Sequence, residues 1–159
     1  MKPKYADLQN EVVRRCPSGH PLVYRCHPVR VVAGRTEPFP TLYWLACDDL
    51  HRQIARIEAD GGVDRAREWM RADEGRLAAM VAAHDEYIAE RESLLTGDER
   101  AALADAGLLD NLRRRGIGGI VARDAVKCLH LHFAHHLARR NVVGAWLDDQ
   151  FELVRCPAP

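Results

Sequence analysis

The sequence predicts an α+β domain that is mostly α-helical, in which a small N-terminal β-hairpin or meander packs on a bundle of about five or six helices. Two observations carry this prediction. Before Cys47, short runs of β-branched and aromatic residues are broken by Pro28 and Gly34, which is typical of short strands joined by turns. After Cys47, apolar residues recur at helical spacing, and cap and turn residues interrupt them at intervals.

The N-terminal residues 1–15 are expected to form a short helical arm, because charged side chains alternate there with Val12 and Val13. A turn follows, with the sequence Cys16-Pro17-Ser18-Gly19-His20-Pro21. Its prolines and its glycine favour a rigid loop over a regular element. The turn therefore presents Cys16 at a defined position.

The predicted strands of the hairpin or meander occupy residues 22–26 and 29–32. A continuous apolar run over residues 41–46 predicts a further, buried strand that ends at Cys47. The next two residues are Asp48-Asp49, which suit a helix N-terminus because its free N–H groups and its dipole favour negative charge. Cys47 is therefore expected at a strand-to-helix junction, a common place to hold a ligand.

Glycines and cap residues divide the helical part of the chain. Gly61-Gly62 stops the first helix, Thr96-Gly97-Asp98-Glu99 introduces a new cap, and the segment that contains Gly107 forms one or two helices. Asn141 is expected to end a histidine-rich helix as a left-handed cap. The predicted helices cover residues 48–60, 64–71, 73–95, 100–115, 123–139 and 142–154.

With 159 residues, the chain is long enough for one domain with its own core and too short for two comfortable domains. Residues 1–159 are therefore expected to form a single domain. The expected parts are the helical arm at 1–15, a β-rich part at 16–47, a helical part at 48–154 and a frayed tail at 155–159.

Charge and hydropathy exclude several classes of protein. Lys and Arg number 23, as do Asp and Glu, so the zero net charge gives no global attraction to nucleic acid or to anionic lipid. No apolar run approaches the roughly 18 residues of a membrane span, and the N-terminus has no apolar signal core. A cytoplasmic protein is expected, whose partner and oligomeric state the sequence leaves open.

The chain contains five cysteines, an odd number without the dense spacing of a disulfide scaffold. In a reducing cytosol such thiols stay free or bind metal. No two cysteines form a CxxC pair, which argues against a zinc ribbon or a thioredoxin-like redox centre.

One cysteine and four of the eight histidines fall within residues 128–136. We expect a helix there that begins near Arg123 or Asp124, and a turn of about 100° per residue then aligns Cys128, His132 and His135 on one stripe. The histidine at position 130 would lie on the opposite, apolar face as a hydrogen-bonded core residue, and the one at position 136 on the surface.

The main functional hypothesis joins Cys16, Cys47 and Cys128 with a histidine of the stripe, His132 first and His135 second. Thiolate and imidazole are the usual ligands of zinc, and three thiolates with one further ligand also suit a cubane iron–sulfur cluster. The alternative is that the cysteines simply pack, because free cysteine behaves as a small, readily buried hydrophobe.

A second hypothesis is anion binding, to a phosphate or to RNA, at the basic and glycine-rich segment that follows the predicted helix 100–115. Backbone N–H groups and basic side chains could gather there, although the spacing matches neither a P-loop nor a Rossmann fingerprint. The alternative is a solvated, arginine-rich helix end before a flexible turn. The candidate anion ligands are Arg114, Arg115, Gly118, Gly119 and Lys127.

Two further possibilities stay open. Cys128 could be a catalytic nucleophile, since the cationic neighbour Lys127 favours a thiolate, but no acidic residue that would orient a base is identifiable in the sequence. The chain could instead be a metal-free interaction module that exposes an apolar patch around Trp69 or Trp146.

Three segments together resemble a bacterial family known only as domain of unknown function 501, and the resemblance covers residues 14–144. It implies no activity. The family tends to have Cys-Pro where this chain has Cys47-Asp48, and Asn-Pro-Val-Gly where it has Asn141-Val142-Val143-Gly144. Cys26 and Cys156 match no family motif and are left out of the predicted site. The segments are Cys16-Pro17-x-Gly19-x-Pro21, residues 38–47, and Gly118-Gly119-Ile120 with residues 127–137.

Overall fold

The computed structural model describes residues 10–156 of the chain. The strands within these residues form two small antiparallel sheets. β1 (Asn10–Arg15), β2 (Pro21–Cys26) and β5 (Tyr43–Leu45) form a three-stranded sheet in the order β1-β2-β5. β3 (Val29–Val32) and β4 (Arg35–Pro38) pair as a separate hairpin.

The N-terminal arm differs from the prediction. Residues 10–15 pair with β2, with Val12 opposite Tyr24, so the predicted helix is wrong for this part. β-Branched side chains are more favourable on a pleated, half-buried sheet than on a short isolated helix, and β2 supplies the partner strand. The rest of the predicted arm, residues 1–9, lies outside the described residues.

Seven α-helices and one 3-10 helix follow β5 within residues 10–156, which confirms the mostly helical α+β class. The first helix begins directly after Cys47, with Asp48 and Asp49 in its first turn, as predicted. Thr96 and Glu99 form the capping box of α4. The helices are α1 (Asp48–Ala59), α2 (Gly62–Arg71), α3 (Glu74–Ser93), α4 (Gly97–Asp105), α5 (Leu109–Arg114), the 3-10 helix η1 (Ile117–Gly119), α6 (Leu129–Ala138) and α7 (Val142–Phe151).

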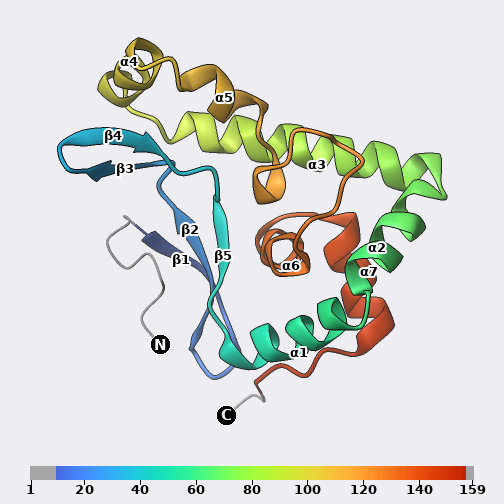
Figure 1. Ribbon diagram of the computed structural model, residues 1–159. Coiled ribbons are helices and arrows are strands. Elements are labelled where there is room, and N and C mark those ends of the chain that lie inside the picture. Colours follow the sequence, from blue (N-terminus) through green and yellow to red (C-terminus); the bar gives the residue numbers. More distant parts are fainter. Residues whose placement is uncertain (1–9, 157–159) are drawn as a thin grey trace.

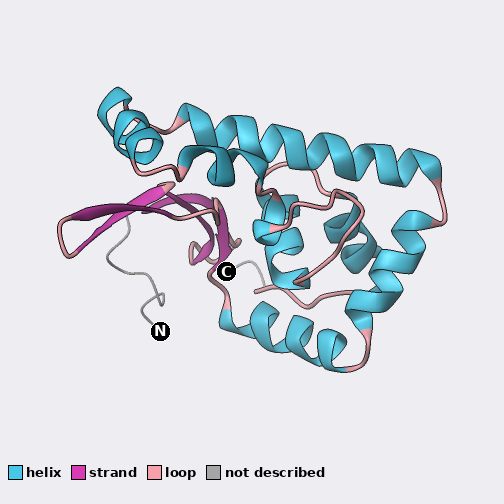
Figure 2. Cartoon of the chain, turned by 45° about the horizontal axis from the view of Figure 1, so that its top comes forward, coloured by secondary structure: helices cyan, strands magenta, loops and turns pink. Residues whose placement is uncertain are grey.

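Helix α6 occupies the middle of the fold. α1, α2 and α3 run around it in turn, and the sheet lies on the remaining side (Figure 1). The strands are gathered at one end of the molecule and the helices fill the rest (Figure 2). α6 packs against α7, β5 and α1, and its residues Leu129, Phe133 and Ala134 are completely buried. Side chains on α6 are therefore surrounded by several elements.

The start of α6 differs from the prediction. The helix begins at Leu129 rather than near Arg123 or Asp124, and Cys128 is its extended N-cap residue. Arginines hold the preceding loop in place. Arg71 donates to the carbonyl oxygen of Asp124 (3.1 Å), and Arg123 donates to the carbonyl oxygen of Arg114 (3.2 Å). These tertiary contacts replace helical hydrogen bonds that sequence patterns predict.

Asn141 begins a helix instead of ending one. Its φ of −150° is extended rather than left-handed, and its side-chain oxygen accepts from the N–H groups of Val143 (3.1 Å) and Gly144 (3.0 Å). This is N-cap geometry for α7. Gly144 also allows the two helices to approach closely, because a Cβ atom there would lie 2.2 Å from Cβ of His136.

A buried arginine connects α3 to α5 and to the segments before β5 and after α5. Arg91 is fully buried and donates to the carbonyl oxygens of Pro40 (2.8 Å), Leu112 and Arg115 (2.5 Å). A guanidinium group can satisfy several carbonyls at once, which stabilises chain segments that have no regular partner. None of the helices within residues 10–156 is long and apolar enough to span a membrane.

Candidate metal centre

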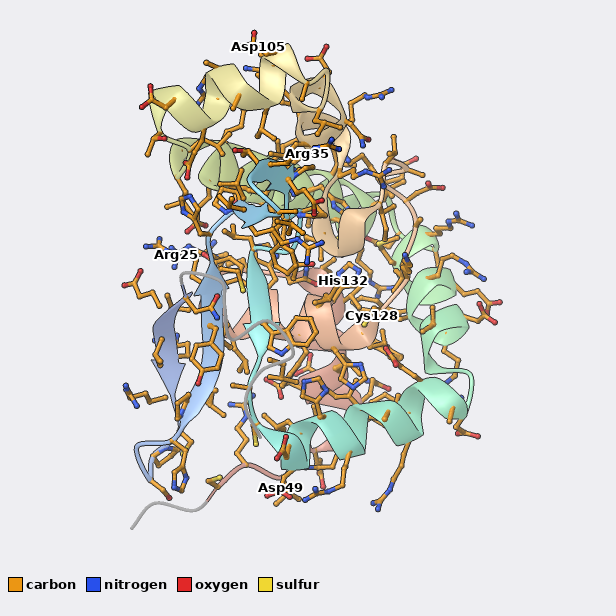
Figure 3. The ribbon with its side chains drawn as sticks, turned by 60° about the vertical axis from the view of Figure 1, so that its left-hand side comes forward. Arg25, Arg35, Asp49, Asp105, Cys128 and His132 are labelled. Atoms are coloured by element: carbon orange, nitrogen blue, oxygen red, sulfur yellow. The ribbon has the colours of Figure 1, made fainter. Side chains whose placement is uncertain are left out.

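Cys128 lies at the N-terminus of α6, at the end of the loop that follows η1. Its backbone is extended (φ −143°, ψ 115°), and its side chain makes no capping hydrogen bond. Figure 3 labels Cys128 and His132 near the middle of the molecule, next to the surrounding helices. The thiol is therefore available for contacts with other elements.

The side chains of Glu58, Cys128 and His130 converge at this point. Nδ1 of His130 lies 3.7 Å from Sγ of Cys128 and 3.2 Å from Oε2 of Glu58. One donor atom from each of the three residues lies within 4.8 Å of the others. Thiolate, imidazole and carboxylate are all ligands of zinc, so the cluster has the composition of a metal site.

Further hydrogen bonds orient these donors. The other oxygen of Glu58, Oε1, accepts from the backbone N–H of Leu129 (2.6 Å). Nε2 of His130 is 3.1 Å from the backbone oxygen of His51, to which it donates, and the two imidazole rings stack with centroids 4.6 Å apart. Metal-binding histidines usually donate their second ring N–H to such a carbonyl, which fixes the ring and leaves the other nitrogen for the metal.

The charge state of His130 reflects its neighbours. Burial lowers its pKa, but the hydrogen bonds with Cys128 and with the His51 carbonyl, together with the charge of Glu58, outweigh burial and raise the pKa to about 9. Without a metal ion, the imidazole is therefore protonated at neutral pH. A metal ion at Nδ1 would replace this proton.

The two histidines of the predicted stripe lie in the interior, on another part of α6. His132 and His135 each place Nδ1 3.2 Å from the side-chain nitrogen of Asn141. Burial, and after it the charge of neighbouring histidines, lowers the pKa of His132 to about 3. Burial lowers the pKa of His135 to about 4, although the charge of Glu90 opposes the shift. Both rings are therefore neutral and fixed by the amide that also caps α7.

The remaining cysteines of the predicted site belong to a different group. Sγ of Cys16 and Cys156 and a ring nitrogen of His20 lie within 4.8 Å of one another. Cys47 lines the same cavity. Cys16 and Cys47 thus line one cavity, but Cys47 is not within ligand distance of the whole Cys16 group, and neither Cys128 nor His132 belongs to that group. Of the predicted tail 155–159, Arg155 is exposed and Cys156 is half-buried, and residues 157–159 lie outside the described part of the chain.

The predicted anion-binding segment uses much of its polar backbone internally. The N–H groups of Gly116, Ile117 and Gly119 donate to the oxygen of Ile120 (2.7 Å), to Nδ1 of His84 (3.0 Å) and to the oxygen of Gly116 (3.0 Å) respectively. The Arg115 guanidinium donates to the oxygen of Gly119 (3.0 Å). Of the other candidate ligands, Arg114 and Lys127 are exposed. A phosphate would have to displace several of these bonds.

The two tryptophans considered for an interaction surface pack against each other. The ring centroids of Trp69 and Trp146 are 6.1 Å apart, and Trp146 is 6% exposed. The large apolar side chains that residues 10–156 expose are valines on separate loops and edges: Val31, Val32, Val121 and Val154. The part of the chain that the structure describes therefore has no tryptophan-centred patch.

Sequence reasoning missed Glu58 and His130 as partners of Cys128. Residues 128 and 130 would point to different sides of a helix, so a helix that starts before Cys128 separates them. The extended N-cap conformation of Cys128 removes that separation. Glu58 lies on α1, and no local pattern connects it to position 128. The pattern Cys128-x-His130-x-His132 was the feature of the sequence that could have indicated His130 as a partner of Cys128.

The comparisons with known proteins agree with the resemblance noted in the sequence. The family described as a protein of unknown function (DUF501) matches residues 12–149. No curated protein and no solved structure matches the chain.

Proposed function

The chain belongs to the DUF501 family of proteins of unknown function, and we propose that it is a zinc-binding protein whose ion is held by Glu58, Cys128 and His130. The observation that carries the proposal is the separation of the donor atoms. Zinc bonds of about 2.3 Å to sulfur and about 2.0 Å to nitrogen or oxygen place tetrahedral S and N ligands about 3.5 Å apart, and N and O ligands about 3.3 Å apart. The distances in the cluster are 3.7 and 3.2 Å.

The donor types favour zinc over an iron–sulfur cluster. Clusters are held mainly by several thiolates, whereas this group has one thiolate, one imidazole and one carboxylate. Such a mixed set suits a borderline-soft ion. The second hydrogen bonds of Glu58 and His130 use Oε1 and Nε2, so Oε2 and Nδ1, which are 3.2 Å apart, are the atoms that would bind an ion.

Three protein ligands leave a fourth coordination position. Zinc sites with this arrangement are catalytic in general, because water or substrate takes the fourth position. The side chains of His130 and Glu58 are 15% and 25% exposed, so solvent reaches the cluster. We infer an ion that is open to a small ligand rather than one that only supports the fold.

A second candidate function uses the same atoms without a metal. Sγ of Cys128 lies 3.7 Å from Nδ1 of His130, and a cysteine beside a histidine is the arrangement of a thiol nucleophile with its base. A metal-free protein whose Cys128 reacts with iodoacetamide much faster than a free thiol at pH 7 would favour this alternative. A bound zinc ion would instead protect Cys128 from alkylation until a chelator removes the ion.

The test is the metal content of protein purified anaerobically without a metal-affinity tag. Zinc, iron and acid-labile sulfide are measured in the wild type and in Cys128→Ser, His130→Gln and Glu58→Gln. His136→Gln is the matched control, because this histidine is also on α6 but pairs with Asp148. We expect each of the three site variants to contain one zinc fewer per chain than the wild type and the control.

Equal zinc content in all five proteins would overturn the proposal. Iron with sulfide that is lost in Cys128→Ser would overturn the choice of zinc. Cobalt substitution tests the open position. The visible spectrum of cobalt bound to Glu58, Cys128 and His130 should change when azide or cyanide is added, whereas a fixed spectrum would mean that the fourth position is closed.

A further inference from the structure

Three segments that are distant in the sequence meet at a second group of thiols. The turn between β1 and β2 carries Cys16 and His20, the junction of β5 and α1 carries Cys47, and the segment after α7 carries Cys156. All four side chains line one cavity of about 800 Å³. We propose that these residues bind a second zinc ion in a closed, four-ligand site that fastens the C-terminal segment to the sheet.

The spacing fits a single ion. Donor atoms of Cys16, His20 and Cys156 lie within 4.8 Å of one another. Two ligands of one zinc ion are about 3.3–3.8 Å apart in a tetrahedron and at most about 4.6 Å apart. A cubane cluster distributes its ligands over separate irons and spaces them more widely. The close approach therefore favours one ion over a cluster.

The turn that carries Cys16 has the features of a metal-binding loop. The backbone N–H of His20 donates to Sγ of Cys16 (3.3 Å), and the N–H of Cys16 donates to the oxygen of His20 (2.9 Å). The N–H of Gly19 donates to the oxygen of Cys16 (2.9 Å). An N–H group directed at sulfur stabilises its thiolate form, which is the form that binds metal.

Cys47 lines the same cavity, but its sulfur is outside the 4.8 Å that joins the donor atoms of Cys16, His20 and Cys156, so its side chain would have to turn inward to become the fourth ligand. It is the N-cap residue of α1, and its side chain makes no capping hydrogen bond. Three thiolates and one imidazole form a common ligand set of closed zinc sites, in which no position remains for water.

The position of Cys156 is determined by a specific contact with α1. The side-chain amide of Gln53 donates to the oxygen of Val154 (3.0 Å) and accepts from the N–H of Val154 (2.9 Å). This pair of bonds resembles the pairing of two strands. It fixes the backbone at Val154, which is two residues before Cys156. Simple packing of a thiol in a core would not need such a clamp, nor an imidazole from an exposed turn residue.

The second site differs from the first in chemistry and in role. Glu58, Cys128 and His130 leave a position open, whereas Cys16, His20, Cys47 and Cys156 fill all four. His51 lies between the two, since it lines the cavity and its ring stacks on His130. Because the two sites share no ligand, loss of the closed site should release the C-terminal segment from the sheet and leave zinc bound at the open site.

The test is the zinc content and the cobalt spectrum of Cys16→Ser and Cys156→Ser, with Cys26→Ala as a control cysteine outside both groups. We expect two zinc ions per wild-type chain, one in each of the two serine variants, and two in the control. In Cys128→Ser, cobalt at the remaining site should show strong sulfur-to-cobalt charge transfer from three thiolates, unchanged by azide.

X-ray absorption at the zinc edge, on the wild type and on Cys128→Ser, counts the sulfur ligands directly. We expect an average of two sulfur ligands per zinc, rising to three in Cys128→Ser. Unchanged zinc in Cys16→Ser and Cys156→Ser, with one equivalent lost only in Cys128→Ser, would overturn the second site and leave the first standing. A Cys16–Cys156 disulfide in freshly isolated protein, seen as a loss of two mass units without zinc, would also overturn it.

Discussion

Replacing His84 with asparagine should make the stability of the protein less sensitive to acid. His84 is fully buried, and its Nδ1 accepts from the N–H of Ile117 (3.0 Å). Burial, and after it the charge of Arg123, lowers its pKa to about 4. A histidine in the unfolded chain titrates near pH 6.5, so the unfolded state binds more protons than the folded state between these values.

The sign and size of the effect follow from this difference. Since the folded pKa is the lower one, the free energy of unfolding is unaffected well above pH 6.5, falls as the pH decreases towards 4, and levels off below that. With pKa values of about 6.5 unfolded and about 4 folded, His84 alone accounts for a loss of about 2 kcal/mol between pH 7 and pH 5. Asparagine cannot take up a proton, and its side-chain oxygen can accept from Ile117 in place of Nδ1.

Urea unfolding at pH 7, 6 and 5, with a chelator present so that metal release does not contribute, measures this directly. The wild type should lose about 2 kcal/mol more than His84→Asn over this range. Leu103→Ala is the control, because it removes a fully buried side chain without a titratable group and should shift all three values equally. The same loss in His84→Asn as in the wild type would refute the reasoning.

Four further outcomes are expected. Gly144→Ala should lower the free energy of unfolding by about 2 kcal/mol, because the new Cβ meets His136, while Gly97→Ala, with nothing within 4 Å, should not; equal effects in urea unfolding would contradict this. Arg91→Met should cost about 3 kcal/mol in thermal unfolding, since three backbone carbonyls lose their donor. Thr96→Ala should cost about 1 kcal/mol by removing the capping box of α4. Zinc affinity at the open site, measured by competition with a chelator, should fall as the pH is lowered from 7.5 to 6, because protons compete with the metal for thiolate and imidazole.

Local signals were sufficient for most of the helices. Asp48-Asp49 after Cys47, the Gly61-Gly62 break and the Thr96 capping box each depend on neighbours within a few residues, and the corresponding helices are found where the sequence predicts them. Gly107 also separates α4 from α5. Such signals act through backbone conformation and capping, which depend on residue types at neighbouring positions and can therefore be predicted from the sequence.

Elements that depend on distant partners were not predictable in this way. β1 is a strand because β2 lies beside it. The loop before α6 is held because Arg71 donates to the carbonyl of Asp124 in the loop, while Arg123 of the loop donates to the carbonyl of Arg114 at the end of α5. The late start of α6 changes the direction of Cys128. The candidate site also depends on distant partners. The sequence pattern identified Cys128 as a candidate ligand, but Glu58 lies on another helix and its position beside His130 is seen only in the fold.

The central claim is tested most directly by an anomalous difference map at the zinc absorption edge, from crystals of protein purified without a metal-affinity tag. A peak within about 2.0–2.3 Å of Sγ of Cys128, Nδ1 of His130 and Oε2 of Glu58 is expected. A map with no peak there, while Cys128 remains reduced and His130 keeps its contact with Glu58, would contradict the proposed zinc site.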